Sequence, residues 1–140
     1  MPRRRRTRST HPSTLSPDTI APLIRGVLSP DLLKPAYRRS AAGKPASYGH
    51  CYAASEAAYH LLGGKAKGWT PQSIQHEGGP HWFLRHRSGA VLDITDDQFQ
   101  TPVPHGRAVG KGFLTRTPSA RARAIIDRVR AARGETHAHA

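Results

Sequence analysis

Cysteine is nearly absent from the sequence, because Cys51 is the only one among 140 residues. A single cysteine cannot form a disulfide within the chain, so the fold does not call for an oxidising compartment. No apolar run approaches the ~18 residues that a membrane-spanning helix requires. The basic start, "MPRRRRTRST", is not followed by the apolar segment of a secretory signal. We therefore expect a cytoplasmic protein that makes no membrane contact.

Acidic residues are also scarce, with nine Asp and Glu against 22 Lys and Arg. Residues 1–40 carry a net charge of +7 and residues 106–140 one of +6, whereas residues 41–105 are neutral. Clustered cations bind phosphates with little sequence preference, so residues 3–8 and 107–133 are candidates for nucleic-acid contact. The same composition also fits a solvated, arginine-rich surface with no specific partner.

The length leaves room for one domain with a real core. Residues 1–16 consist mainly of Arg, Ser, Thr and Pro, which predicts a disordered tail. We expect a single domain over residues 17–134 and a second flexible tail over residues 135–140.

Helical spacing and capping signals predict four helices. The first begins at Ser16-Pro17-Asp18, and a short one runs from Ser29-Pro30-Asp31 to about Tyr37. The third begins at Cys51 and ends at Leu62, before Gly63-Gly64. A last helix begins at Thr117-Pro118, with proline in its first turn, and ends at Gly134.

Between these helices the pattern changes to that of strands, predicted at residues 72–77, 81–87 and 90–95. Gly78-Gly79-Pro80 and the region of Ser88-Gly89 are expected to connect them as hairpins. The sequence therefore indicates an α+β fold, in which the Cys51 helix packs on a small antiparallel sheet between flanking helices.

The strands predicted at residues 81–87 and 90–95 can pair in either of two registers. A two-residue turn at Ser88-Gly89 would pair Leu84 with Asp93, and would bring Asp96 opposite His81. A three-residue turn at residues 87–89 instead pairs Phe83 with Asp93, and its apolar face is continuous. That face contains Trp82, Leu84, Leu92 and Ile94. We predict the second register, in which His81 and Asp93 share the other face as diagonal neighbours.

Three residues form the candidate catalytic site. Cys51 at a helix N-terminus gains from the helix dipole, which favours the thiolate. His81 on a facing strand can take the thiol proton, and Asp93 on the next strand can orient the imidazole. In the other register, Asp96 replaces Asp93 as the third member. The structural alternative is a buried hydrogen-bonded cluster with no chemistry.

Further residues are candidates for the cleft. Acyl transfer needs donors for an oxyanion, and the Cys51 N–H is one of them. No glutamine lies in "KPASYGH" before the cysteine, so Tyr48 and His50 are alternative donors. His76 and Trp82 are expected to line the cleft.

A zinc site at Cys51, His76 and His81 is an alternative, but no CxxC or HxxxH spacing supports it. We therefore predict no metal and no cofactor.

Four segments carry a resemblance to a known family. "GHCYAASEAAYHLLGG", "HEGGPHWFL", "VLDITDDQF" and "GFLTRTPSARA" resemble the blocks of a small family from bacteriophages and actinobacteria that has no established activity. This likeness covers residues 48 to about 130. More distantly, the Cys–His–Asp order is similar to that of the papain-like superfamily, including transglutaminase-like and bacteriocin-processing peptidase domains. His81-Trp82 and Asp93-Ile94-Thr95 match the transglutaminase pattern, with Ile94 in place of a proline.

The resemblance implies a papain-like core, with Cys51 as nucleophile, His81 as base and Asp93 as the orienting residue. The leading expectation is a thiol-dependent hydrolase or acyltransferase that acts on a peptide or amide. The alternative is a non-catalytic basic protein that binds nucleic acid or a phage or host partner.

Overall fold

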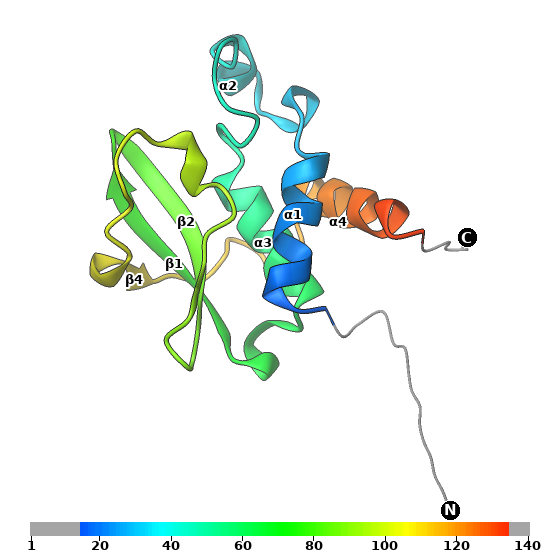
Figure 1. The fold of residues 1–140 in the computed structure, drawn as a ribbon, viewed down its shortest axis with the longest axis vertical. Coiled ribbons are helices and arrows are strands. Elements are labelled where there is room, and N and C mark those ends of the chain that lie inside the picture. The colour runs from blue at the N-terminus through cyan, green and yellow to red at the C-terminus, as the bar shows by residue number, and fades with distance from the viewer. Residues whose placement is uncertain (1–14, 135–140) are drawn as a thin grey trace, which may run out of the picture.

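A computed structural model describes residues 15–134 of the chain and shows a mixed helical and sheet fold. The four-stranded sheet has the order β3-β2-β1-β4, and all its pairs are antiparallel. Helix α3 (Cys51–Leu61) lies between this sheet and the pair α1 and α4 (Figure 1). The predicted α+β class is therefore confirmed. The two predicted tails, and the basic segment 3–8, lie outside the described residues apart from residues 15 and 16.

Helix α1 (Pro17–Val27) begins where the sequence predicts. The Ser16 side chain caps it by accepting a hydrogen bond from the backbone N–H of Thr19 at 3.1 Å. Pro17 occupies the first turn, where a missing N–H costs nothing. The buried face of the helix, Ile20, Ala21 and Ile24, packs into the core.

The short second helix predicted to run to about Tyr37 is instead split in two. A 3-10 helix, η1 (Pro30–Leu32), is followed by an extended Leu33 and then by α2 (Pro35–Arg39). The prediction missed this break because a residue before proline is driven out of the helical region, and Lys34 precedes Pro35.

The first hairpin joins β1 (Trp69–His76) to β2 (Gly79–His86) through a tighter turn than predicted. His76 pairs with Gly79, so Glu77-Gly78 is a two-residue turn, and both of its residues have positive φ. Gly79 and Pro80 therefore belong to β2 rather than to the connection. A proline is tolerated there because β3 does not extend to that end of β2.

The second hairpin has the predicted register. Leu84 pairs with Leu92 across β2 and β3 (Val91–Leu92), which is the alignment that the three-residue turn requires. The turn closes with a hydrogen bond from the Gly89 N–H to the His86 carbonyl at 2.8 Å, and Gly89 has φ 96°. Strand β3 ends at Leu92 rather than continuing to residue 95, because the chain bends there into the 3-10 helix η3 (Asp96–Gln98).

Residues 100–113 are more ordered than their Pro and Gly content suggests. They contain the 3-10 helix η4 (His105–Arg107) and the strand β4 (Val109–Gly110), which pairs with the edge of β1. Two residues are too few to show the alternation of apolar and polar side chains by which a strand is recognised in a sequence.

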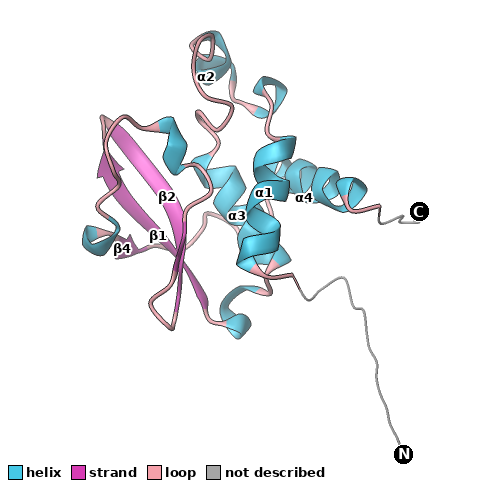
Figure 2. Ribbon diagram, in the orientation of Figure 1, coloured by secondary structure: helices cyan, strands magenta, loops and turns pink. Residues whose placement is uncertain are grey.

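Helix α4 (Ala120–Ala132) begins after Ser119 rather than at Thr117-Pro118. Its buried face, Ala122, Ile125, Ile126 and Val129, packs on α1 and α3 as Figure 2 illustrates. Ser119 caps α4 by accepting a hydrogen bond from the N–H of Ala122. None of the helices within residues 15–134 has the length and apolar character that crossing a bilayer requires.

The start of α4 is anchored by Glu56, a carboxylate in the middle of α3 with no exposed surface. It accepts hydrogen bonds from the Ser119 hydroxyl at 2.7 Å and from the Ser119 N–H at 3.1 Å. A carboxylate at a helix N-terminus is also stabilised by the helix dipole. This one side chain therefore fixes where α4 begins relative to α3.

We predict that Glu56→Ala lowers the free energy of unfolding by about 3 kcal/mol, because it leaves a buried cavity and removes two hydrogen bonds. Glu56→Gln keeps the volume and one acceptor, so it should lose less. Urea unfolding measures both variants. The exposed Asp127 of α4 supplies the control, since Asp127→Ala should stay within about 0.5 kcal/mol of the wild type. A similarly small effect of Glu56→Ala would contradict this account of the α3–α4 junction.

Candidate active site

Cys51 is the first residue of α3, and the chain enters it through Gly49 and His50. Gly49 has φ 79°, and a Cβ atom there would lie 2.8 Å from Cδ2 of Leu33, so this position favours glycine. The thiol is half-buried and donates a long hydrogen bond to the carbonyl of Pro80, with Sγ 3.8 Å from the oxygen. Because Pro80 precedes His81 in the chain, Cys51 lies beside the predicted base.

His81 has no exposed surface, and only one of its two ring nitrogens has a hydrogen-bond partner among the described residues. Its Nε2 donates to both carboxylate oxygens of Asp93, at 2.9 and 2.8 Å. The other ring nitrogen, Nδ1, has no hydrogen-bond partner among the described residues. The ring packs edge-on against Phe99, with the two centroids 4.7 Å apart.

The charge state of His81 follows from its neighbours. Burial alone disfavours the charged ring, but the hydrogen bond to Asp93 and the interaction with the Cys51 thiol outweigh it, and they raise the pKa of His81 to about 9. At neutral pH the ring is therefore an imidazolium. The structure thus brings the three predicted residues Cys51, His81 and Asp93 together.

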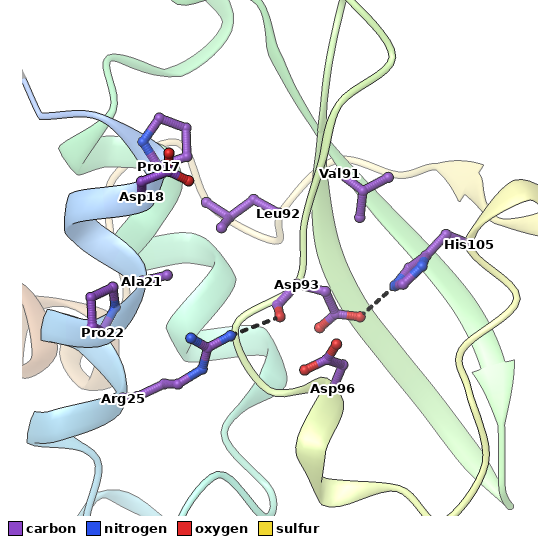
Figure 3. Close-up of a pocket in the computed structure, with 10 residues that line it drawn as sticks. All are labelled: Pro17, Asp18, Ala21, Pro22, Arg25, Val91, Leu92, Asp93, Asp96 and His105. Atoms are coloured by element: carbon purple, nitrogen blue, oxygen red, sulfur yellow. Dashed lines mark hydrogen bonds and ion pairs between the residues drawn. The ribbon is translucent and has the colours of Figure 1, made fainter.

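Asp93 follows β3 directly, and its carboxylate is only 3% exposed. Besides His81 it accepts a second hydrogen bond, from Nε2 of His105 to Oδ2 at 2.7 Å (Figure 3). The sequence did not indicate His105, because it lies 12 residues further along in a Pro- and Gly-rich segment with no periodicity. The carboxylate is thus shared by two histidines, one buried and one partly exposed.

Arg25 of α1 fixes the backbone on which Asp93 is mounted. Its Nε donates to the carbonyl of Ile94 at 2.8 Å, and its guanidinium also reaches the carbonyl of Asp93 at 3.5 Å. This contact joins α1 to the loop after β3. It holds the carboxylate in place without neutralising it directly.

Asp96, the alternative third member, does not reach His81 among the contacts of the described residues. It lies in η3 beside a second cavity of about 510 Å³, and its carboxylate points toward that of Asp93 (Figure 3). Burial, together with the nearby charge of Asp93, raises the pKa of Asp96. The hairpin register explains this outcome, because only the discarded two-residue turn would have brought Asp96 opposite His81.

Cys51 opens into a cleft of about 780 Å³. Of the predicted cleft residues, Tyr48, His76 and Trp82 line it. The turn Glu77-Gly78 and the start of β2 form one wall, and the segment around α2 and the start of α4 form others. Its aromatic and aliphatic lining side chains are Tyr37, Tyr48, Tyr52, Trp82, Phe99 and Leu114.

His50 does not line this cleft. Its side chain is fully buried, and neither ring nitrogen has a hydrogen-bond partner among the described residues. Burial, and then the charge of Arg121, lower the pKa of His50 to about 4. His50 is therefore neutral at neutral pH.

Gln98 is a second residue that the sequence did not indicate. Its Oε1 accepts a hydrogen bond from the Gly49 N–H at 3.3 Å, and its Nε2 donates to Oγ1 of Thr95 at 3.1 Å. An amide nitrogen has two hydrogens, so one N–H stays available in the cleft. Gln98 follows Cys51 by 47 residues. It therefore lies outside the segment before the cysteine, where papain-like enzymes have their glutamine.

Of the residues in the zinc alternative, His76 has its Nε2 hydrogen-bonded to the carbonyl of Thr101 at 3.1 Å, whereas Nδ1 of His81 has no partner among the described residues. Within residues 15–134 there is no group of three or more His, Cys, Asp or Glu side chains placed to hold a metal ion.

Comparison of the chain with protein-family models, curated proteins and solved structures finds no significant match. The resemblance to the phage and actinobacterial family, and to the papain-like superfamily, therefore stays a prediction.

The two buried histidines predict opposite effects of pH on stability. The pKa of His50 is about 4 in the folded chain against an ordinary 6.5, so stability should fall as the pH drops from 6.5 toward 4. The pKa of His81 is about 9, so its contribution is complete below 6.5 and is lost as the pH rises to 9.

We expect His50→Leu to weaken the fall in the free energy of unfolding between pH 6.5 and 4, since leucine has no proton to take up. The fall in stability between pH 6.5 and 9 should be unchanged. Urea unfolding at a series of pH values measures both slopes. An acid slope that is the same in the variant and the wild type would contradict the assignment of His50 as a buried neutral ring.

Proposed function

We propose that the protein is a cysteine-dependent hydrolase or acyltransferase that acts on an amide or peptide bond. One observation carries the proposal. His81 is fully buried, its Nε2 is bonded to Asp93, and its unpartnered Nδ1 belongs to the ring that interacts with the Cys51 thiol. A thiol beside a charged imidazole at a helix N-terminus is the usual arrangement of an activated cysteine nucleophile.

In the first half-reaction, the Cys51 thiolate attacks the carbonyl carbon, a C–S bond forms, and the carbonyl electrons move to the oxygen. The His81 imidazolium then donates its Nδ1 proton to the leaving nitrogen, and the C–N bond breaks. The products are a thioester on Cys51, a free amine and a neutral His81. Asp93 keeps the ring oriented and stabilises its charged form at the start of the cycle.

In the second half-reaction, His81 takes a proton from water while the water oxygen attacks the thioester. The C–S bond breaks, the acid leaves, and the thiolate–imidazolium pair is restored. An amine in place of water gives transfer instead of hydrolysis. Both outcomes use the same residues.

Two donors are placed to stabilise the oxyanion. The backbone N–H of Cys51 lies at the start of α3, where no side chain caps the helix. Gln98, which lines the same cleft and bonds to the Gly49 N–H, supplies a carboxamide N–H. Gln98 therefore takes the role for which Tyr48 and His50 were the sequence candidates, since His50 is fully buried and does not line the cleft and the Tyr48 hydroxyl shares a hydrogen bond with Ser40.

The element order supports a papain-like core as the finer description of the fold. A helix that begins with the cysteine packs on an antiparallel sheet, and the histidine and the aspartate follow on and beside adjacent strands. The sheet is smaller than the helical layer in this chain, and the third residue lies just past the end of its strand.

The second candidate function is binding of nucleic acid through the basic C-terminal region. The specific observation is the exposed side of α4, where Arg123 and Arg130 face solvent. Such binding should weaken steeply with added salt. Replacing Cys51 with serine should leave it unchanged, which separates it from the enzymatic proposal.

The rate of Cys51 alkylation by iodoacetamide as a function of pH tests the proposed function. We expect the wild type to react rapidly well below about pH 8, where an ordinary thiol is mostly protonated. His81→Ala should react at least tenfold more slowly at neutral pH and should titrate like a free thiol.

His86→Ala is the matched control, because His86 lies on the same strand at its far end and bonds to Lys67 and Ser88 instead. It should keep the wild-type profile. If Cys51 is inert until the protein unfolds, or if the wild type and His81→Ala give the same profile, the proposed function is wrong.

A further inference from the structure

The cleft that contains Cys51 has an uneven charge. Among the described residues, three cationic side chains line it, Lys34, Lys44 and Arg121, and Glu77 is the one acidic lining residue. A fourth cation, Lys111, lies over the ring of Trp82, with Nζ 5.7 Å from the ring centroid. The three lining cations come from two separate parts of the chain, the segment around α2 and the start of α4, so they do not form a row along one helix.

Glu77 forms no ion pair with Lys34, Lys44 or Arg121 among the described residues, because its carboxylate is hydrogen-bonded elsewhere. It accepts hydrogen bonds from the N–H of Gln100 at 3.1 Å and of Thr101 at 2.8 Å, and from the Thr101 hydroxyl. These bonds lower the pKa of Glu77, the Thr101 hydroxyl contributing most. Glu77 therefore ties the hairpin turn to residues 100–101 and acts as a structural anchor of the cleft wall.

The cleft cations have no carboxylate partner. Within the part of the chain that the structure describes, none of Lys34, Lys44, Lys111 and Arg121 forms an ion pair. Lys44 instead lies 5.5 Å from the centroid of the Tyr48 ring, a contact that holds the ammonium group at the cleft and leaves its charge uncompensated.

Arg121 lies at the start of α4 and lines the same cleft as Cys51. Burial dominates the pKa shifts of His50 and Tyr52, and the charge of Arg121 acts on both of them. These two residues flank Cys51 in the chain. Arg121 is also well positioned by the backbone, because it follows Ser119, which Glu56 fixes at the start of α4.

We propose that the cleft selects acyl donors that carry a carboxylate close to the scissile carbonyl, as an acidic peptide does, and that Arg121 binds this carboxylate. The inference rests on the proposed function of Cys51 and adds the substrate class. A guanidinium matches a carboxylate with two parallel hydrogen bonds. The aromatic lining around Tyr52 and Trp82 would hold the neighbouring apolar part of the donor.

Two alkylating reagents that differ in charge test the role of Arg121. Iodoacetate is anionic and iodoacetamide is neutral, and both react in the same way. The thiolate forms a bond to the methylene carbon, the C–I bond breaks, and iodide leaves. The ratio of the two rates for one protein therefore reports the local preference for an anion and not the reactivity of the thiol.

The comparison is made between the wild type, Arg121→Gln and the control Arg130→Gln. Arg130 is exposed on the same helix and does not line the cleft. The His81 imidazolium favours iodoacetate equally in all three proteins, so the difference between them isolates Arg121.

We expect the iodoacetate-to-iodoacetamide ratio to fall about three- to tenfold in Arg121→Gln, the size expected for one charge about 4 Å away that is screened as in bulk water. The ratio should be unchanged in Arg130→Gln. The difference in ratio between the wild type and Arg121→Gln should disappear in about 1 M salt. An equal ratio in all three proteins would overturn the inference and leave the proposed function standing. Slow iodoacetamide alkylation of the native wild type would overturn both.

A pair of peptide aldehydes tests the substrate class directly. The two carry Glu or Gln next to the aldehyde, and Cys51 adds reversibly to the aldehyde carbon while the oxygen takes up a proton. The Glu compound should protect Cys51 from iodoacetamide at concentrations at least threefold lower than the Gln compound, and Arg121→Gln should remove this difference. Equal protection by both compounds in the wild type would contradict the preference.

Discussion

The bond between His81 and Asp93 is the interaction on which the rest of the site depends. It links β2 to the segment just after β3 and lies almost entirely out of water, with the two side chains 0% and 3% exposed. A buried pair of this kind costs desolvation energy that an apolar pair would not. The arrangement is therefore a poor way to stabilise the fold and a good way to hold one imidazole charged, in a single orientation, next to Cys51.

The surrounding structure holds both ends of this bond. Arg25 fixes the backbone at Asp93 and Ile94, and Phe99 packs against the imidazole. Gly49 lets the chain turn into α3 so that the thiol meets the hairpin at Pro80. His105 shares the Asp93 carboxylate from the more exposed side, which connects the buried pair to a second cavity lined by Asp18 and Asp96. Cys51 and His81 thus belong to different elements, α3 and β2, and the Asp93 carboxylate holds the His81 ring in one orientation.

The sequence predicted the parts of this arrangement that rest on periodicity and turn chemistry. The α3 helix beginning at Cys51 was recognisable from its spacing and from Gly63-Gly64, and the β2–β3 register followed from the segregation of apolar residues. The same register predicted that Asp93, and not Asp96, lies beside His81. What could not be predicted lies in segments without periodicity. Gln98 and His105 reach the site from 3-10 turns whose position depends on tertiary contacts, and the Glu77-Gly78 turn requires a positive φ at a glutamate that its side-chain bonds compensate.

Titration of the His81 ring by NMR tests the central claim most directly, since it observes the charged imidazole without requiring a substrate. In the wild type the ring should lose its proton at about pH 9. Asp93→Asn removes the charge that sustains it, so the transition should move down toward the ordinary 6.5 or below, whereas Asp96→Asn should leave it well above that value. A His81 ring that already titrates near 6.5 in the wild type, or that responds equally to the two substitutions, would contradict the account.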